Sequence, residues 1–170
     1  MTHTARPIDE RTVAAKIKEI IHQQHIMTLA TTSAGIPWAA PVYYAVLDES
    51  LYFFSNPDAR HIQNVLDSKA AACAIYEDAD AWIDIRGLQI SGTINAVPAG
   101  RQAGRAVHAY LKRFPTIRHI FKPPAPIELG HFYRKFHARL YRFTPETITY
   151  TDNRIRFGFK TEISADRIVE

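Results

Sequence analysis

A short segment in the first half of the chain concentrates side chains that bind anions. The sequence SNPDARHIQN, residues 55–64, supplies the hydroxyl of Ser55, the guanidinium of Arg60 and the imidazole of His61. Hydroxyl, guanidinium and protonated imidazole groups are donors that hold a phosphate dianion. These residue types at this spacing indicate a phosphate site, and a solvated surface face is the competing interpretation.

The same segment predicts the start of a helix. Asn56 is a suitable N-cap, and Pro57 suits the first helical position. Arg60 and His61 would then lie in the first turns, where the helix dipole is already positive and cations are unfavourable. A bound anion would remove that conflict, because helix N-termini bind phosphate. The glycine-rich patterns GxxxxGK[ST] and GxGxxG do not occur, so side chains and the helix start would have to hold the phosphate.

A proline inside a strand-like run offers a place for a flat ligand. The run WAAPVYYAVL, residues 38–47, predicts a strand, but Pro41 removes one donor from the hydrogen-bond ladder and therefore indicates an edge or a bulge. Small neighbours would let a ligand approach the backbone, and aromatic neighbours would form walls around it; ordinary packing is the alternative. These neighbours are Ala39, Ala40, Trp38, Tyr43 and Tyr44.

Length and composition favour one globular domain that spans residues 1–170, with residues 1–8 as a flexible N-terminus. The chain has 170 residues, and 46% of them are hydrophobic, which is enough for a core. Cys73 is the single cysteine, so we expect a buried, inert thiol and a reducing compartment. We expect a cytoplasmic protein, because the N-terminus lacks the apolar stretch of a signal peptide and no run approaches membrane-spanning length.

Other signatures of catalysis and metal binding do not occur in the sequence. The patterns GxSxG and HExxH are missing, and the acidic stretch YEDADAWID does not match a calcium loop. His22 and His25 lie three residues apart on an expected helix, but no acid or cysteine stands at a matching short spacing. We therefore predict that the protein holds no metal.

Charge is distributed unevenly between the two halves of the chain. Residues 1–85 hold 6 Lys and Arg against 11 Asp and Glu, whereas residues 86–170 hold 15 against 6. A basic half allows a nucleic-acid interface, with aromatic residues as stacking faces. The basic residues are interleaved with core-like residues, so a groove for a small anion explains them as well, and we consider nucleic acid an unlikely partner. The candidate stacking residues are Tyr141, Phe143, Tyr150, Phe157 and Phe159.

The order of the expected elements favours a mainly β protein with flanking helices, built as a bent antiparallel sheet that closes into a barrel. A bulge or a bend is expected at Gly87, a helix N-cap at Asp9, and hairpin turns at Asp48–Ser50 and at Asp152-Asn153. Residues 122–130 form an expected proline-rich loop. The expected helices are 9–24, one from Pro57, and 101–114; the expected strands are 26–32, 38–47, 51–55, 70–76, 82–97 and 137–160.

The stretch from IMTLATTSAGIPWAAPVYYAVLDESLYFFSNPDARHIQN to IRGLQISGTI resembles the FMN-binding split-barrel superfamily of pyridoxamine 5'-phosphate oxidase-like proteins. The tail, with YLKRFP and YTDNRIRFGF, resembles the YhbP-like group within that superfamily. The resemblance implies a six-stranded antiparallel split β-barrel and a homodimer with FMN at its two-fold interface.

The resemblance also implies which residues bind the flavin. The ring would lie along the second strand, and the phosphate would bind after the third strand and at a pair of cations opening the helix. His61 stands where relatives have a lysine, and Ala39 where the oxidases have an arginine; Arg86 or Arg139 would complete the phosphate site. The implied cofactor-binding residues are Ala39, Ala40, Pro41, Val42, Tyr43, Tyr44, Phe54, Ser55, Arg60, His61 and Arg86.

An FMN-dependent oxidoreductase, either a flavin reductase or a pyridoxamine-phosphate-oxidase-like enzyme with an unassigned substrate, is the function that the resemblance favours. In such a protein the flavin carries out the redox chemistry, and the protein binds and orients it. No side-chain acid or base is assigned. A non-catalytic module that binds or stores flavin or haem is the alternative, because related split barrels handle haem.

Overall fold

Antiparallel pairing joins all the described strands into one sheet. The computed structural model describes residues 9–121 and 127–168, and its sheet has the order β2-β1-β5-β6-β7-β4-β3, with β8 paired to β7. The strands are β1 (Ile26–Ser33), β2 (Ile36–Tyr43), β3 (Ala45–Leu47), β4 (Ser50–Ser55), β5 (Ala70–Tyr76), β6 (Arg86–Ala96), β7 (Arg139–Asp152) and β8 (Lys160–Ser164).

The sheet closes into a barrel because its two edge strands are continuous in the chain. Only Tyr44 separates β2 from β3, and its backbone N–H donates to the carbonyl oxygen of His25 at 3.2 Å. Counting β2 and β3 as one bent strand, six strands form the barrel, and β8 pairs with β7 outside this ring while its Ile163 is buried in the main core cluster. The predicted antiparallel split barrel with flanking helices is therefore confirmed.

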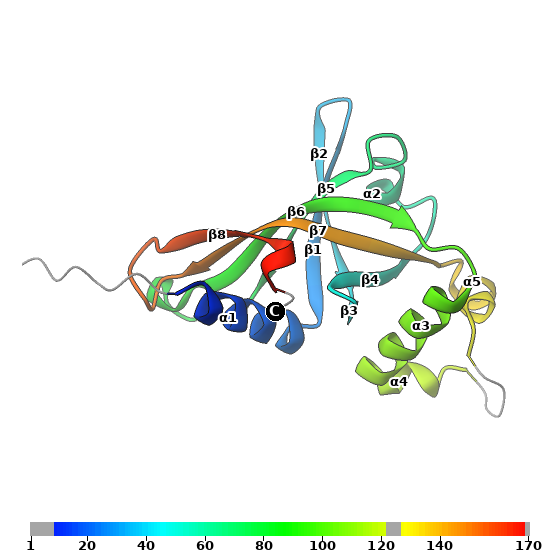
Figure 1. Cartoon of the computed structure of the whole chain (residues 1–170). Coiled ribbons are helices and arrows are strands. Elements are labelled where there is room, and N and C mark those ends of the chain that lie inside the picture. The colour runs from blue at the N-terminus through cyan, green and yellow to red at the C-terminus, as the bar shows by residue number, and fades with distance from the viewer. Residues whose placement is uncertain (1–8, 122–126, 169–170) are drawn as a thin grey trace, which may run out of the picture.

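Helices cover two separate parts of the barrel. Figure 1 shows α1 along the half formed by β6, β7 and β8, and α3, α4 and α5 gathered at the opposite end of β7. The side chain of Asp9 accepts a hydrogen bond from the N–H of Thr12 and so caps α1 as predicted. The helices are α1 (Glu10–Gln23), α2 (Arg60–Gln63), α3 (Arg101–Arg113), α4 (Pro115–Arg118) and α5 (Leu129–Phe136), with short 3₁₀ turns η1 (Trp82–Asp84) and η2 (Ala165–Ile168).

The main core lies between α1 and the inner face of the barrel. Ile17 and Ile20 of α1 are fully buried with Met27, Leu29 and Phe53 from the strands. Burial of such aliphatic and aromatic side chains stabilises the fold by about 1.5–3 kcal/mol each. Cys73 also lies in this core, as predicted, and burial raises the pKa of its thiol.

Several expected elements differ from the structure. The helix predicted from Pro57 is only the four-residue α2, and Asn56 is not its cap, because the N-cap position falls on Ala59. The register shift in β6 lies between Ser91 and Gly92. Of the bulge or bend predicted at Gly87, the bulge is therefore wrong, and the bend stays a prediction.

The bulge has a steric cause. A side chain at position 92 would place its Cβ 2.2 Å from the carbonyl oxygen of Thr144, so β6 and β7 meet there more closely than any other residue permits. The hairpin after Asp152 is confirmed, but its return strand begins only at Lys160.

Part of the expected loop at 122–130 is helical, since Leu129 and Gly130 begin α5. Residues 122–126 and the predicted flexible N-terminus 1–8 lie outside the described residues. No described helix is long and apolar enough to cross a membrane. The cytoplasmic location and the single domain stay predictions.

Candidate functional site

The cofactor-binding residues predicted on the second strand lie on both faces of the β1–β2 hairpin. Thr28 pairs with Pro41 and Ala30 with Ala39, and side chains on one strand alternate between faces. Ala39, Pro41 and Tyr43 therefore point away from the barrel, where all three are exposed. β2 pairs with β1 alone among the described strands, so Pro41 lies at an edge as predicted.

The other three candidates of this run face the core. Ala40 and Tyr44 are buried, and Val42 packs against the main core cluster. The hydroxyl of Tyr44 donates to the carbonyl oxygen of Ile21 at 2.8 Å, and burial raises the pKa of that phenol. The prediction that the Tyr44 side chain forms a ligand wall is wrong, because the strand alternation directs it inward.

A cavity opens where the tip of the hairpin separates from β5. It measures about 660 Å³, within the usual range of ligand pockets. Small residues line most of it, and the indole of Trp38 lines one side. The lining residues are Ala30, Thr31, Thr32, Pro37, Trp38, Ala39, Ala70, Ala71 and Ala72.

The segment after β4 is a turn followed by one helical turn. The side-chain oxygen of Asn56 accepts from the N–H of Asp58 at 2.8 Å, which is an Asx turn. A single turn such as α2 provides neither the free amides nor the dipole of a longer helix, so the predicted helix N-terminal phosphate site is not formed. Any anion bound here must be held by side chains.

Arg60 and Asn64 connect α2 to the β1–β2 hairpin. The guanidinium carbon of Arg60 lies 4.3 Å from the centre of the Trp38 ring, within cation–π range. The side-chain amide of Asn64 donates to the hydroxyl of Thr31 at 3.1 Å. Both hairpin residues line the 660 Å³ cavity. No local sequence pattern marks Asn64 or Thr31 as neighbours at this cavity; only the tertiary structure brings them together.

Ser55 and His61 are in direct contact. Oγ of Ser55 lies 2.8 Å from Nε2 of His61; the Ser55 side chain is buried and His61 is half-buried. Burial lowers the pKa of His61 below its ordinary value, so the free protein carries a neutral imidazole here at neutral pH. The structure thus brings together two of the three side chains that the sequence offers for a phosphate site, and their role in binding one stays a prediction.

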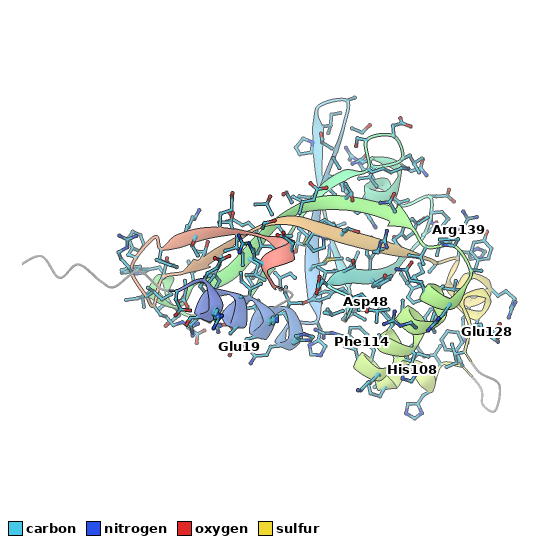
Figure 2. The ribbon with its side chains drawn as sticks, viewed as in Figure 1. Glu19, Asp48, His108, Phe114, Glu128 and Arg139 are labelled. Carbon is cyan, nitrogen blue, oxygen red and sulfur yellow. The ribbon has the colours of Figure 1, made fainter. Side chains whose placement is uncertain are left out.

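The two arginines considered for the phosphate site lie at opposite ends of β7. Arg139 is the cross-strand partner of Ser55 and is exposed beside the last turn of α5 (Figure 2). Arg86 is the partner of Asp152, at the other end of that 14-residue strand. The strand register therefore places Arg139 opposite Ser55, with its guanidinium carbon 5.5 Å from the centre of the Tyr133 ring, and keeps Arg86 away from this end of the strand.

Arg86 instead forms a buried charge cluster. Its guanidinium donates to Glu19 at 2.8 Å and to Glu77 at 2.9 Å, and lies 3.7 Å from Asp152. Burial opposes its charge, but the hydrogen bonds to Glu19 and Tyr150 raise the pKa of Arg86 overall. Glu19, Glu77 and Tyr150 occupy its donors, so within one chain Arg86 does not reach the Ser55 segment, and its binding to a cofactor phosphate stays a prediction.

Phe54 also points away from the phosphate candidates. Its ring stacks on Phe132 of α5 with centroids 3.8 Å apart and meets Tyr110 of α3 edge-on at 5.1 Å. Ser55, the next residue, faces the opposite side of β4 because of the strand alternation. Phe54 therefore anchors the helices, and only its backbone remains available to a ligand.

Of the five aromatic residues considered for stacking on nucleic acid, Phe157 alone is exposed, and the other four are buried or half-buried. Tyr141, Phe143 and Tyr150 are buried in the core, so they cannot stack on bases. Phe157 is exposed and contacts Trp82 edge-on. Within the described residues, no group of three His, Cys, Asp or Glu side chains is placed to hold a metal ion.

A closed six-stranded antiparallel barrel, with an exposed hairpin and a polar turn after its β4 strand, defines a split-barrel protein. The sequence profile described as pyridoxamine 5'-phosphate oxidase matches residues 13–152. The chain therefore belongs to the pyridoxamine 5'-phosphate oxidase family.

Curated relatives place the chain beside the YhbP proteins. YhbP of Salmonella paratyphi A is 29% identical over 140 residues, covering 81% of this chain and 84% of the relative. YhbP of Escherichia coli is 26% identical over 146 residues, covering 85% and 88%. The predicted YhbP-like grouping is confirmed.

Solved structures share the fold at low sequence identity. A haem-binding protein from Mycobacterium smegmatis has a TM-score of 0.69 at 17% identity, covering 97% of this chain and 61% of that one. The haem storage protein HutZ from Vibrio cholerae has a TM-score of 0.63 at 19% identity, covering 78% and 89%. An FAD-binding protein from Mesorhizobium loti has a TM-score of 0.61 at 19% identity, covering 81% and 92%.

Proposed function

We propose that the protein is a cytoplasmic homodimer that binds FMN and acts as an oxidoreductase on a small-molecule substrate. The observation that carries this proposal is the position of α2. Its Arg60 lies over Trp38 at the hairpin cavity, and its next residue, His61, contacts Ser55. One turn of helix thus joins an anion-binding group of residues to a cavity lined by small residues.

The polar group of residues suits a phosphate. Ser55 and His61 supply neutral hydrogen-bonding groups that contact each other. Arg60 and Arg139 add permanent positive charge; Arg139 lies opposite Ser55 in the pairing of β4 with β7. Charge-assisted bonds from guanidinium groups are the stronger contributors. A phosphate dianion would also favour the protonated form of His61 and so add a third cation.

The cavity suits a flat ring. Alanines line its floor, so an aromatic ring system could approach the backbone of β2 and β5 closely, and the indole of Trp38 would lie against its edge. When bound, the flavin would supply the hydride and electron transfer. The residues named here bind and orient it.

The outer face of the hairpin favours a two-fold dimer. Ala30, Ala39 and Ala72 are exposed on neighbouring strands in one register. Large apolar side chains with exposed fractions of 47–61% flank them: Ile26, Tyr43 and Tyr76. A face of exposed apolar residues on a monomer is typical of a protein–protein interface. A partner on this face would also cover the hairpin cavity and exclude water from it.

Haem is the second candidate ligand. Two of the solved structures with this fold are a haem-binding protein and a haem storage protein. The second half of the chain carries exposed histidines, His108 and His137, that could ligate iron, and basic residues that could bind propionates. On this alternative the protein binds or stores haem without turnover.

Absorbance and mass of the released cofactor separate these candidates. The purified protein is expected to show flavin bands near roughly 450 nm and to release a compound with the mass of FMN on denaturation. A Soret band near roughly 400 nm would favour haem. A colourless protein that takes up neither added FMN nor added haem would contradict both.

A further inference from the structure

A second cavity lies on the side of the barrel where α1 ends, away from the hairpin. It measures about 770 Å³ and is formed by the end of α1, the edge strand β3 and one face of α3. None of the residues that line the hairpin cavity lines this second cavity, and neither Ser55 nor His61 lines it. Its lining residues are His22, Ala45, Val46, Leu47, Gly104, Arg105, His108, Ala109, Lys112 and Arg113.

Positive charge dominates the polar part of this cavity. Arg105 is neutralised by a bidentate pair with Asp48 at 2.7 and 2.8 Å; Figure 2 shows Asp48 on the β3–β4 turn and His108 on α3. Lys112 and His108 are exposed and form no ion pair within residues 9–121 and 127–168. The cavity therefore retains at least one unneutralised ammonium group at neutral pH.

Arg113 forms the inner wall of the cavity. It donates to the carbonyl oxygens of Ile21 and Gln24 at the end of α1, while its Nε is buried and has no hydrogen-bond partner among the described residues. A buried donor without a partner is uncommon in folded proteins. Burial, and the positive charges of Arg113 and Lys18, also lower the pKa of the neighbouring His22.

An apolar cavity of about 410 Å³ adjoins the first. His22, Val46 and Leu47 line both cavities, so the two meet at the edge of β3. Beyond this shared wall the lining is mainly apolar. It includes Ile21, Leu51, Pro145, Ile148 and Ala165, with Lys18, Asp48 and Glu49 at its rim.

We propose that this pair of cavities binds an amphipathic organic acid, separately from the flavin. The acid group lies between Lys112 and His108 in the larger cavity, and the apolar body extends past Val46 into the smaller one. A carboxylate and a phosphate monoester share this chemistry. A solvated face would account for the cations of α3, but it would not account for an apolar cavity that continues from them.

Octanoate, octyl phosphate and 1-octanol are the probes, measured by isothermal titration calorimetry on the whole chain. Octanoate or octyl phosphate is expected to bind at least tenfold more tightly than octanol, and the stronger of the two identifies the head group. Equal binding of all three probes, or no binding of either acid, would overturn the proposal.

Gly104 offers a blocking variant with a matched control. A side chain there meets no atom within 4 Å of its Cβ, so Gly104→Phe is expected to fill the larger cavity while the helix is retained. Gly104→Ala makes the same backbone change without filling the space. Octanoate binding should fall at least tenfold in Gly104→Phe and stay within about twofold of the parent in Gly104→Ala.

Lys112→Gln tests whether the ammonium group of Lys112 binds the acid group. Lys135→Gln, which removes another exposed lysine on α5, is the control. Loss of one exposed cation is worth about 0.2–1 kcal/mol, or roughly a 1.5- to 5-fold weaker Kd. Unchanged octanoate binding in both Gly104→Phe and Lys112→Gln would place the acid elsewhere and refute the proposal. FMN binding is expected to stay unchanged in all these variants, so this test does not depend on the flavin assignment.

Discussion

Oγ of Ser55 lies 2.8 Å from Nε2 of His61, which has a pKa lowered by burial. This contact makes the candidate phosphate site sensitive to pH. A phosphate dianion favours the imidazolium, so the pKa of His61 should be higher in the complex than in the free protein. FMN affinity is therefore expected to be greatest below the lowered free-protein pKa and to fall as the pH rises through the pKa of the complex.

The control for this pH effect is His61→Gln, which keeps a hydrogen-bonding side chain without titrating. The phosphate of FMN itself takes up a proton as the pH falls through about 6. That change affects binding to the parent and to His61→Gln equally. The ratio of the two Kd values, measured by fluorescence titration from about pH 5.5 to 8.5, isolates His61. A ratio that does not vary with pH would show that His61 is neutral or remote from the phosphate.

Arg60→Ala tests the permanent charge at the same site. The guanidinium lies over Trp38 and is exposed, so its removal should not unfold the chain. We expect FMN binding to weaken by about 1.5–3 kcal/mol, the usual contribution of a hydrogen bond to a charged group. Arg156→Ala, at another exposed arginine, should leave FMN affinity unchanged, and equal affinities in the two variants would contradict the assignment of Arg60.

Arg86→Met is expected to destabilise the fold. Removing one partner from a buried ion cluster costs about 3–5 kcal/mol, because Glu19 loses its ion-pair partner and Asp152 and Glu77 keep only the half-exposed Arg154. Arg105→Met, which breaks the half-exposed pair with Asp48, should cost no more than about 1 kcal/mol. Urea denaturation measures the free energy of unfolding of both variants. Equal losses of unfolding free energy in the two would mean that the Arg86 cluster is not stabilising. The folded fraction of Arg86→Met should retain its FMN affinity.

The same cluster predicts a loss of stability in acid. Burial raises the pKa of Asp152, but hydrogen bonds from Tyr150 and Arg154 outweigh burial, and the net pKa is lowered. A carboxyl group with a lowered folded-state pKa stabilises the fold above its ordinary pKa, and that contribution is lost as the pH falls through the lowered value. Asp152→Asn should flatten the acid limb of the stability curve, measured by thermal unfolding between about pH 2.5 and 6.

Two glycine-to-alanine changes are expected to have opposite effects. In Gly92→Ala the new Cβ would lie 2.2 Å from the carbonyl oxygen of Thr144, so β6 and β7 must move apart at a cost of about 1–3 kcal/mol or more. In Gly104→Ala nothing lies within 4 Å, and the helix should gain up to about 1 kcal/mol. Equal unfolding midpoints for the two variants would show that the bulge tolerates a side chain.

Ala72→Glu tests the proposed dimer. The residue is exposed in the monomer, so the change should not unfold the chain, but an unpaired carboxylate in an apolar interface is costly. Light scattering is expected to give the mass of a dimer for the parent and of a monomer for the variant. Ala15→Glu, on the exposed face of α1, is the control and should stay dimeric. A dimeric Ala72→Glu would place the interface on another face.

Local sequence patterns were sufficient for the elements that depend on local contacts. The Asp9 cap, the α1 and α3 helices and the β3–β4 hairpin all follow from residue type and spacing. At the turn, Asp48 and Glu49 both adopt positive φ angles, which suit a tight two-residue hairpin. The order of these elements, together with the family resemblance, indicated the barrel and the segment around Ser55.

Local patterns failed where a distant contact decides the outcome. Asn56 and Pro57 have the properties of a helix start, yet an Asx turn and the packing of Ile62 limit α2 to one turn. A neighbouring strand approaches both Gly87 and Gly92 too closely for a side chain, and only the pairing of β6 with β7 shows that the register shift lies at Gly92.

The sequence by itself determined the strands, the barrel and the set of residues that we propose to bind an anion. The tertiary structure decided which of them can act together. The register of β7 against β4 and β6 brings Arg139 to Ser55 and takes Arg86 to Asp152. Strand alternation leaves Ala39 exposed and buries Tyr44. The physical reason is that register and facing depend on the pairing of strands far apart in the chain, and residue spacing along one strand does not contain that information.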